Sequence, residues 1–286
     1  MTAGFLTIVD ADFALDGGAM MGIVPRPLWE KAHPPDDRNR IALVSRFAVV
    51  DDRAAGRLWL VDCGIGRDWG PKETGIYAIR PRGIDARSLV RASGFDPDDV
   101  TDVVLTHLHF DHCAGLVRRD PPDGPASPAF PSAVHHVQAA HVEWARSPSV
   151  KDAGSFRADH VAVLASDARL SLAGGDGPLG GAVSVRVASG HSPGMQIVLV
   201  ETTGGTHVFC GDLVPTWSHV RLPWVMAYDT EPVRTIEEKR RLLSDAADRG
   251  WVLVSEHDSR DARARIRRGR SADSFDAETF STPDDR

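Results

Sequence analysis

The stretch THLHFDH, residues 106–112, determines how the rest of the chain is interpreted. It places three histidines and one aspartate within six residues, at His107, His109, Asp111 and His112. Imidazoles bind metal ions or move protons, and burying four such polar groups without partners is costly in free energy. His107 and His109 are two residues apart, so both rings can turn to one side of an extended loop. Asp111 and His112 follow where the chain bends toward a helix, and they can face a second ion.

Outward from this stretch, four apolar runs of strand length each end just before a histidine or an aspartate. VVLT, VRVASG, VFCG and VLVSE lead into His107, His191, Asp212 and His257. Ligands at strand ends on one rim of a sheet are held by a rigid scaffold. Imidazole and carboxylate ligands without thiolate suit Zn²⁺, and also Mn²⁺, Fe²⁺ or Co²⁺. The predicted ligands are His107, His109, Asp111, His112, His191, Asp212 and His257. Seven side chains are too many for one tetrahedral ion but suit two ions that share one carboxylate.

Apolar periodicity predicts strands that alternate with helices. Strands are predicted over residues 41–50, 57–62, 101–107, 183–191, 195–202, 206–212 and 251–257, and a strand that enters a helix over 133–147. A helix is predicted over 85–94. A second helix, 235–250, is predicted to begin at a Thr235 cap with Glu238 three residues on and to end at Gly250. Because strands and helices are interleaved, the fold class is α/β or α+β with sheet at the centre.

Composition limits the classes of partner. The chain has 286 residues, 42% of them hydrophobic, which is enough for one large domain or two modest ones. Its net charge of -7, with no basic block before the final tail, argues against a nucleic-acid partner. No run approaches the roughly 18 apolar residues of a membrane span, and the first residues lack a basic segment. We therefore expect no membrane partner and a soluble, cytoplasmic protein.

Two further features concern the cysteines and the tail. Cys63, Cys113 and Cys210 are widely spaced and form no CxxC pair, so they are predicted to be buried small hydrophobic residues. The sequence from residue 259 onward is charged and sparsely apolar. We predict a single domain over residues 1–258 and a C-terminal extension over 259–286 that is partly flexible, with one short strand at 264–266.

THLHFDH, followed by GHSPGMQ (190–196), FCGD (209–212) and SEHD (255–258), resembles the metallo-β-lactamase superfamily. The earlier LVDCG, residues 60–64, is similar to the family's Asp-bearing strand end, and all these motifs occur in family order. The resemblance implies an αββα sandwich, in which two mixed β-sheets lie between helical layers and the metal site lies at one edge.

The resemblance also implies roles for single residues. One ion would be held by His107, His109 and His191, a second by Asp111, His112 and His257, and Asp212 would bridge the two. Asp62 matches a carboxylate that orients a ligand histidine from behind; the alternative is an ordinary turn residue before Gly64. The implied cofactors are two divalent metal ions, with zinc the first expectation and Mn, Fe or Co as alternatives.

Within the superfamily, HLHFDHCAG and GHSPGMQ resemble the lactonase-like branch, which includes N-acyl homoserine lactonases and organophosphate hydrolases. His109 differs from the Glu of flavodiiron proteins, and Asp212 differs from the Cys of several true β-lactamases. The best-known lactonases carry a Tyr three residues after the bridging Asp, where this chain has Pro215. Tyr228 is the candidate that could supply a phenol from another loop; the alternative is a packed aromatic.

The sequence thus predicts a dinuclear metal-dependent hydrolase in which a metal-bridging hydroxide attacks a lactone or related ester, with Asp111 as both ligand and proton carrier. Alternatives are a phosphotriesterase, a thioesterase similar to glyoxalase II, a mononuclear iron persulfide dioxygenase, or a binding module that keeps the fold without catalysis. The predicted partner is a small-molecule ester or lactone. Segments 18–29 and 215–228, rich in Trp, Met and Pro, could form an apolar lid over the metals or a contact in a homodimer.

Overall fold

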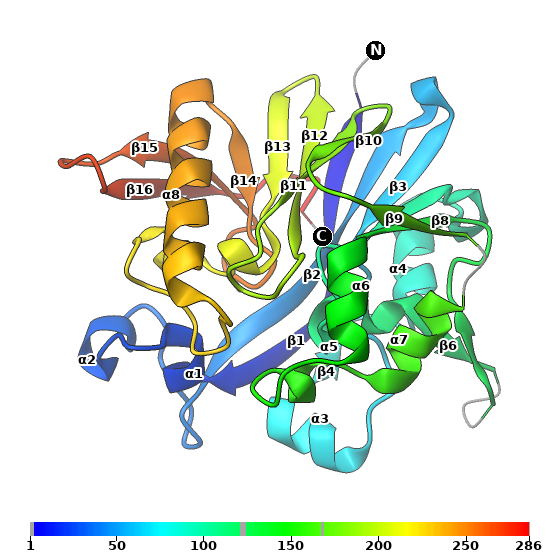
Figure 1. Cartoon of the computed structure of the whole chain (residues 1–286), viewed down its shortest axis with the longest axis horizontal. Coiled ribbons are helices and arrows are strands. Elements are labelled where there is room, and N and C mark those ends of the chain that lie inside the picture. Colours follow the sequence, from blue (N-terminus) through cyan, green and yellow to red (C-terminus); the bar gives the residue numbers. More distant parts are fainter. Residues whose placement is uncertain (1–2, 121–123, 167–168, 286) are drawn as a thin grey trace.

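Two seven-stranded sheets pack face to face, and helices cover their outer faces (Figure 1). The structure is a computed structural model that describes residues 3–120, 124–166 and 169–285. Apolar side chains from both sheets meet in one buried layer, which includes Val50 and Trp59 from the first sheet and Val198 and Phe209 from the second. The predicted αββα sandwich of mixed sheets is confirmed.

The first sheet has the strand order β4-β1-β2-β3-β5-β8-β9. Its members are β1 (Gly4–Asp16), β2 (Arg40–Asp52), β3 (Arg57–Val61), β4 (Arg80–Pro81), β5 (Asp102–Val104), β8 (Val134–Gln138) and β9 (Leu170–Ala173). Strands β4, β1, β2 and β3 pair antiparallel, whereas β3, β5, β8 and β9 run parallel. Strands β3, β5 and β8 are buried between helices and the second sheet, as parallel strands usually are, whereas the edge strand β9 is partly exposed.

The second sheet has the order β10-β11-β12-β13-β14-β15-β16. Its members are β10 (Gly177–Gly180), β11 (Val183–Val187), β12 (Gln196–Thr202), β13 (Gly205–Phe209), β14 (Val252–Val254), β15 (Arg263–Arg268) and β16 (Phe275–Phe280). Only the β13–β14 pair is parallel among these described strands. A separate hairpin joins β6 (Val117–Arg119) to β7 (Ala126–Pro128).

Helices lie outside both sheets and around the edge where the predicted ligands gather (Figure 1). They are α1 (Gly17–Met21), α2 (Arg26–Trp29), α3 (Pro71–Tyr77), α4 (Ala86–Ala92), α5 (Phe110–Cys113), α6 (Ala139–Arg146), α7 (Ala158–Ala165) and α8 (Pro232–Arg249). Residues of α4, α6 and α7 share an apolar cluster with the first sheet, and α8 packs Leu242, Leu243 and Ala246 against the second. None of the helices in the described ranges is long and apolar enough to cross a membrane.

The predicted strands are all present, but four of them end at least three residues earlier than predicted. The runs 101–107, 183–191, 206–212 and 251–257 leave their sheets after Val104, Val187, Phe209 and Val254. Their last residues form the loops that carry polar side chains, and the chain turns there through backbone conformations that a strand does not allow. Gly211, for example, has φ 48°, a left-handed value that suits glycine.

The predicted start of the long helix is wrong. Helix α8 begins at Pro232, with Glu231 as its N-cap residue, rather than at a Thr235 cap. Proline is favoured at the first helical position because its fixed φ is already helical and its missing N–H is not needed there. Glu238 therefore makes no capping box, and its carboxylate is free to contact another loop. The helix predicted over 85–94 is confirmed as α4, which Asp85 caps by accepting a hydrogen bond from Ser88 N.

Both ends of the chain contribute strands. Strand β1 was not predicted, yet it pairs with β2 along almost its whole length. The strand predicted at 264–266 lies within β15, and β16 pairs with it to extend the second sheet. Arg263 joins the two ends: its Nε donates to Asp285 Oδ1 at 2.8 Å and its Nη2 donates to Phe5 O at 3.3 Å.

We predict that the tail hairpin contributes to global stability. Ile266 is 4% exposed and packs in the same cluster as α8, so Ile266→Ala should lower the free energy of unfolding by about 2–5 kcal/mol. Arg267→Ala is the matched control, because this side chain is 64% exposed in its pair with Glu278 and should change stability by less than about 1 kcal/mol. Denaturant titration checks both variants, and equal effects would show that β15 is not part of the cooperative core.

Candidate metal centre

All seven predicted ligand side chains converge at one edge of the sandwich. They lie in the segments that follow β5, β11, β13 and β14, one strand of the first sheet and three of the second, and Asp111 and His112 belong to the short helix α5 after β5. Each of the seven is at most 6% exposed. The convergence follows from the fold, because these strands all end at the edge where the two sheets meet.

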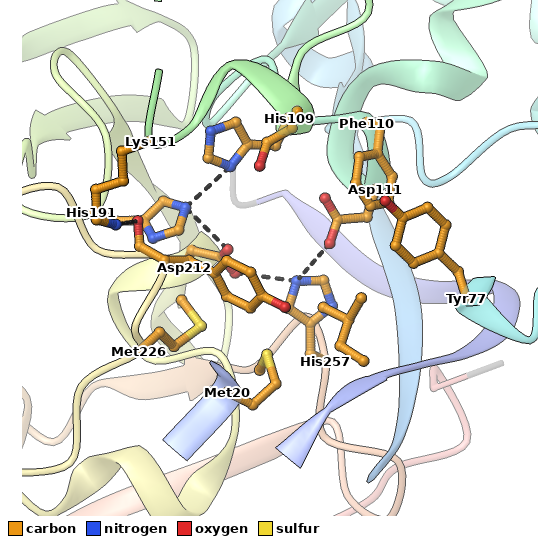
Figure 2. Close-up of a pocket in the computed structure, with 14 residues that line it drawn as sticks. Met20, Tyr77, His109, Phe110, Asp111, Lys151, His191, Asp212, Met226 and His257 are labelled. Atoms are coloured by element: carbon orange, nitrogen blue, oxygen red, sulfur yellow. Dashed lines mark hydrogen bonds and ion pairs between the residues drawn. The ribbon is translucent and has the colours of Figure 1, made fainter. Parts of the chain in front are cut away.

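One group of ligand atoms surrounds a first position. His107, His109, His191 and Asp212 each offer an atom within 4.8 Å of the others. His191 Nε2 lies 3.1 Å from His109 Nδ1 and 3.2 Å from Asp212 Oδ2, as Figure 2 shows. His107 Nε2 is 3.9 Å from the same Asp212 oxygen.

A second group surrounds a neighbouring position. Asp111, His112 and His257 offer atoms that also lie within 4.8 Å of one another. His257 Nε2 is 3.2 Å from His112 Nε2 and 3.7 Å from Asp111 Oδ2, and Figure 2 shows Asp111 and His257 facing each other.

Asp212 faces both groups, with a different oxygen toward each. Its Oδ2 is the atom that lies 3.2 Å from His191 Nε2. Its Oδ1 lies 3.0 Å from His257 Nε2 and 3.5 Å from His112 Nε2. A single carboxylate between two ligand groups is the geometry that a bridging ligand requires.

The residues present fit metal ions at these positions. His107 Nε2 and Asp212 Oδ1 are buried and have no hydrogen-bond partner among the described residues. Buried polar atoms are rarely left unpaired in folded proteins, and ions at the two positions would satisfy these atoms. The donors are imidazole nitrogens and carboxylate oxygens, which suit zinc and neighbouring transition metals. The three cysteines are buried and unpaired, and none belongs to either ligand group.

The electrostatics of the site also favour cations. Burial lowers the pKa of His107 and of His109 well below the usual value, which keeps both rings in the neutral form that binds metals. Burial would lower the pKa of His257 too, but Asp212 and Glu256 outweigh it and raise that pKa to about 9. The carboxylates thus create a negative potential at the second position, which a bound cation would neutralise.

Most ligand rings are held from behind by a hydrogen bond at the outer nitrogen. The outer Nδ1 atoms of His107, His191 and His257 lie 3.1 Å from Thr106 Oγ1, 2.9 Å from Asp229 Oδ1 and 2.9 Å from Val44 O. Such partners fix the tautomer and orientation of a ligand ring. Asp229, at 2% exposure, was missed by sequence analysis because it lies 38 residues from His191 with no spacing motif between them.

Asp62 lies where the sequence places it, behind the ligands. Its Oδ1 accepts from Thr106 N and its Oδ2 accepts from Thr106 Oγ1, both at 2.6 Å. Oδ2 also lies 3.2 Å from His112 Nδ1. Asp62 has φ 58°, a strained value for a non-glycine residue that these contacts hold in place.

Two buried side chains hold the ligand loops, and no sequence motif indicated either. The Glu238 carboxylate accepts from Ser189 N at 3.0 Å and from Gly190 N at 2.8 Å, next to His191. The Arg46 guanidinium donates to Ser255 O at 2.5 Å and to Asp258 O at 3.1 Å, on either side of His257. Both contacts join residues far apart in sequence, so only the tertiary structure reveals them.

Other histidines of the chain lie outside the two ligand groups and are buried. They are His33, His135, His136, His141, His160 and His207. His141 has a structural role at the site that its sequence context did not suggest. Its Nε2 accepts from Leu108 N at 2.8 Å and its Nδ1 donates to Pro193 O at 2.8 Å, so it joins the loops of His107 and His191.

A cavity of about 240 Å³ opens over both ligand groups. Its walls include Leu15, Met20, Tyr77, Phe110, Lys151, Met226 and Tyr228. Met20 comes from the segment 18–29, and Met226 and Tyr228 come from 215–228, the two segments considered for an apolar lid. Figure 2 shows Tyr77 and Phe110 beside Asp111, and Lys151 on the side of His191.

Tyr228 belongs to this cavity rather than to the core alone. Burial raises the pKa of its phenol, and the nearby Asp111 carboxylate raises it further, so the hydroxyl stays protonated near neutral pH. Lys151 holds this loop from across the cavity, where its Nζ donates to Ala227 O at 2.7 Å and to Tyr228 O at 2.8 Å.

Comparison with protein families agrees with this geometry. The model of the metallo-beta-lactamase superfamily matches residues 48–257. N-acyl homoserine lactonase AttM of Azorhizobium caulinodans is 32% identical over 181 residues, which cover 59% of this chain and 62% of AttM. The chain therefore matches about three-fifths of the length of this relative. A probable metallo-hydrolase of Mycobacterium tuberculosis is 26% identical over 250 residues, with 76% of each chain covered.

Solved structures share the fold at low sequence identity. A probable metal-dependent hydrolase from Staphylococcus aureus superposes with a TM-score of 0.84, at 24% identity over 98% of each chain. AidC, a dizinc quorum-quenching lactonase in complex with a product, gives a TM-score of 0.79 at 16% identity, over 98% of this chain and 95% of AidC.

We predict that Glu238 maintains the His191 loop. Glu238→Ala leaves two buried N–H groups without an acceptor, at about 1–3 kcal/mol each, and should lower both thermal stability and metal retention during dialysis. Glu237→Ala is the matched control on the same helix, because that side chain is 61% exposed and pairs only with Arg240. Metal retention that is equal in the two variants would rule out this role.

Proposed function

Because the chain belongs to the metallo-β-lactamase superfamily, we propose that it is a dinuclear metal-dependent hydrolase that cleaves a lactone or a related ester. The observation that supports two ions rather than one is the carboxylate of Asp212. Its two oxygens face two separate groups of ligand atoms, and each oxygen lies within 3.2 Å of a histidine nitrogen.

In this proposal, His107, His109 and His191 hold one ion, Asp111, His112 and His257 hold the other, and Asp212 is shared. Zinc is the first expectation for both, with Mn, Fe or Co as alternatives that accept the same donors. Divalent ions held here would supply a water of lowered pKa as nucleophile and a Lewis acid for the substrate oxygen.

The side chains of the cavity account for the remaining steps. Asp111 lines the cavity beside His257, where its carboxylate can accept a proton from the attacking water and pass it to the leaving oxygen. Tyr228 also lines the cavity, and its protonated phenol can donate a hydrogen bond to the oxygen on which negative charge develops. Asp62 acts only through Thr106 and His112, which it orients.

The cavity walls support an ester with an apolar group. Leu15, Met20, Phe110 and Met226 form an apolar wall next to the ligands. Such a wall favours an acyl chain or a similar apolar substituent over a charged one. The AttM relatives are named N-acyl homoserine lactonases, which supports a lactone as the first substrate class to test.

A phosphotriester or aryl ester is the second candidate, and Pro215 is the observation that favours it. The lactonase-like branch has a Tyr at this position, whereas the carbonyl of Pro215 accepts from Ser255 Oγ at 2.6 Å and from His257 N at 3.1 Å. This segment therefore holds the ligand loop and offers the substrate no phenol. A cytoplasmic location and a homodimer stay predictions from the sequence.

We predict about two transition-metal ions per chain, measured by elemental analysis after purification and dialysis. Asp212→Ala should lower the content for both ions and remove most activity, because one carboxylate serves both positions. A content near one ion in the wild-type protein, unchanged by added metal, would contradict the dinuclear site.

We also predict that at least one lactone is hydrolysed, in a reaction that a chelator abolishes and that His109→Ala does not support. Proton release from a panel of lactones, aryl esters, phosphotriesters and thioesters measures this. Tyr228→Phe should lower kcat about 100-fold if its phenol stabilises the developing charge. Tyr77→Phe is the matched control, since Tyr77 lines the same cavity. Strong turnover of another ester class without any lactone turnover would overturn the substrate but not the metallohydrolase.

A further inference from the structure

Glu256 is a buried carboxylate that the proposed reaction does not use. It precedes His257 in sequence and is 0% exposed. Neither of its oxygens has a hydrogen-bond partner among the described residues. A buried carboxylate without a partner is costly in free energy, so its presence in the core requires an explanation.

The carboxylate lies directly behind a predicted metal ligand. Glu256 Oε2 is 2.8 Å from His112 Nδ1, although the two groups are not aligned for a hydrogen bond. His257 thus faces the second position with its own Nε2, whereas Glu256 lies at the outer Nδ1 of the His112 ring.

His112 is the ligand histidine with two carboxylates at its outer nitrogen in the described part of the chain. Asp62 Oδ2 lies 3.2 Å from the same Nδ1 that Glu256 approaches. The outer nitrogens of His107 and His257 instead face a hydroxyl and a backbone carbonyl, and that of His191 faces one carboxylate. Since Nδ1 carries at most one proton, it can donate to only one of these two carboxylates at a time.

Among the described residues, no neighbouring group donates an aligned hydrogen bond to the Glu256 carboxylate. The oxygens of Asp62 already accept hydrogen bonds from Thr106 N and Thr106 Oγ1. The nearby Arg46 guanidinium donates to the backbone oxygens of Ser255, Glu256 and Asp258 rather than to the Glu256 carboxylate. The polar group that the carboxylate approaches is therefore His112, whose Nε2 faces the second position.

We propose that Glu256 is a positioning residue that tightens metal binding at the position formed by Asp111, His112 and His257. This inference rests on the proposed dinuclear site. A carboxylate next to the Nδ1–H of an imidazole makes its other nitrogen a stronger ligand, and negative charge acts strongly in a buried environment. Asp111 lies at this position, and Asp62 and Glu256 lie behind His112, whereas Asp229 is the carboxylate behind His191 at the other position. The second position is therefore the tighter of the two.

The test is metal titration of the Glu256→Gln variant, which removes the charge and keeps the side-chain volume. Metal-depleted protein is titrated with Co²⁺ or Zn²⁺ against a chromophoric chelator. We expect one of the two binding constants to fall about 10–100-fold and the other to stay unchanged. Asp229→Asn is the matched control, since it removes the carboxylate behind His191 and should weaken the other ion.

Two backgrounds identify the position affected. In a His109→Ala background, which disables the first position, Glu256→Gln should still weaken the remaining ion. In a His257→Ala background, which disables the second position, it should have no further effect. Equal weakening of both ions, or an effect only in the His257→Ala background, would overturn the inference.

Stability of the metal-free protein separates this role from a merely structural one. Glu256→Gln replaces a buried carboxylate that has no aligned hydrogen bond among the described residues by a neutral amide, so the metal-free variant should unfold at the same or a higher denaturant concentration than the wild type. A variant that is less stable without metal, with both binding constants unchanged, shows that Glu256 serves only the fold. If the wild-type protein binds a single ion, the proposed function fails first; if it binds two and Glu256→Gln binds both as tightly, only this inference fails.

Discussion

The carboxylate of Asp212 is the contact on which the site depends. It lies between two groups of buried imidazoles, with one oxygen 3.2 Å from His191 Nε2 and the other 3.0 Å from His257 Nε2. Burying so many titratable groups at one edge of a sandwich is unfavourable unless positive charge is present among them. Asp212 thus joins the two sheets, because it follows β13 of the second sheet and its carboxylate contacts His112, which follows β5 of the first sheet.

Buried contacts with the scaffold hold three of the four loops that carry predicted ligands. Glu238 on α8 accepts from the backbone beside His191, and Arg46 on β2 donates to the backbone on both sides of His257. His141 on α6 joins the loops of His107 and His191. These contacts fix backbone rather than ligand atoms. The backbone that carries these side chains is therefore held by the scaffold, which is the support that a precisely arranged site needs.

The two ligand groups differ in their surroundings. In the first group, His107 has a hydroxyl behind its ring and His191 has one carboxylate. In the second group, His112 has two carboxylates behind its ring, those of Asp62 and Glu256. The cavity wall also differs between the two groups, because Asp111 and Tyr77 lie on the side of the second group (Figure 2). Unequal surroundings suit unequal tasks, since one ion can be held firmly while the other exchanges contacts with a substrate.

The sequence by itself determined the class of fold and predicted the ligand set. HxHxDH and the polar residue after each apolar run can be recognised locally, because the predicted ligands come shortly after strands in the sequence. A strand that ends at the edge of a sheet places the residues after it at that edge. Only the tertiary structure revealed which buried side chains contact the predicted ligands and their loops. Glu238 was interpreted as part of a helix cap, and its partners Ser189 and Gly190 lie 49 and 48 residues away in sequence. Strand β1 and the contacts of Asp229 and Glu256 likewise depend on pairing between distant segments. Periodicity reports which residues are buried, but a buried carboxylate acquires its role only from the atoms that the folded chain brings within hydrogen-bonding distance of it.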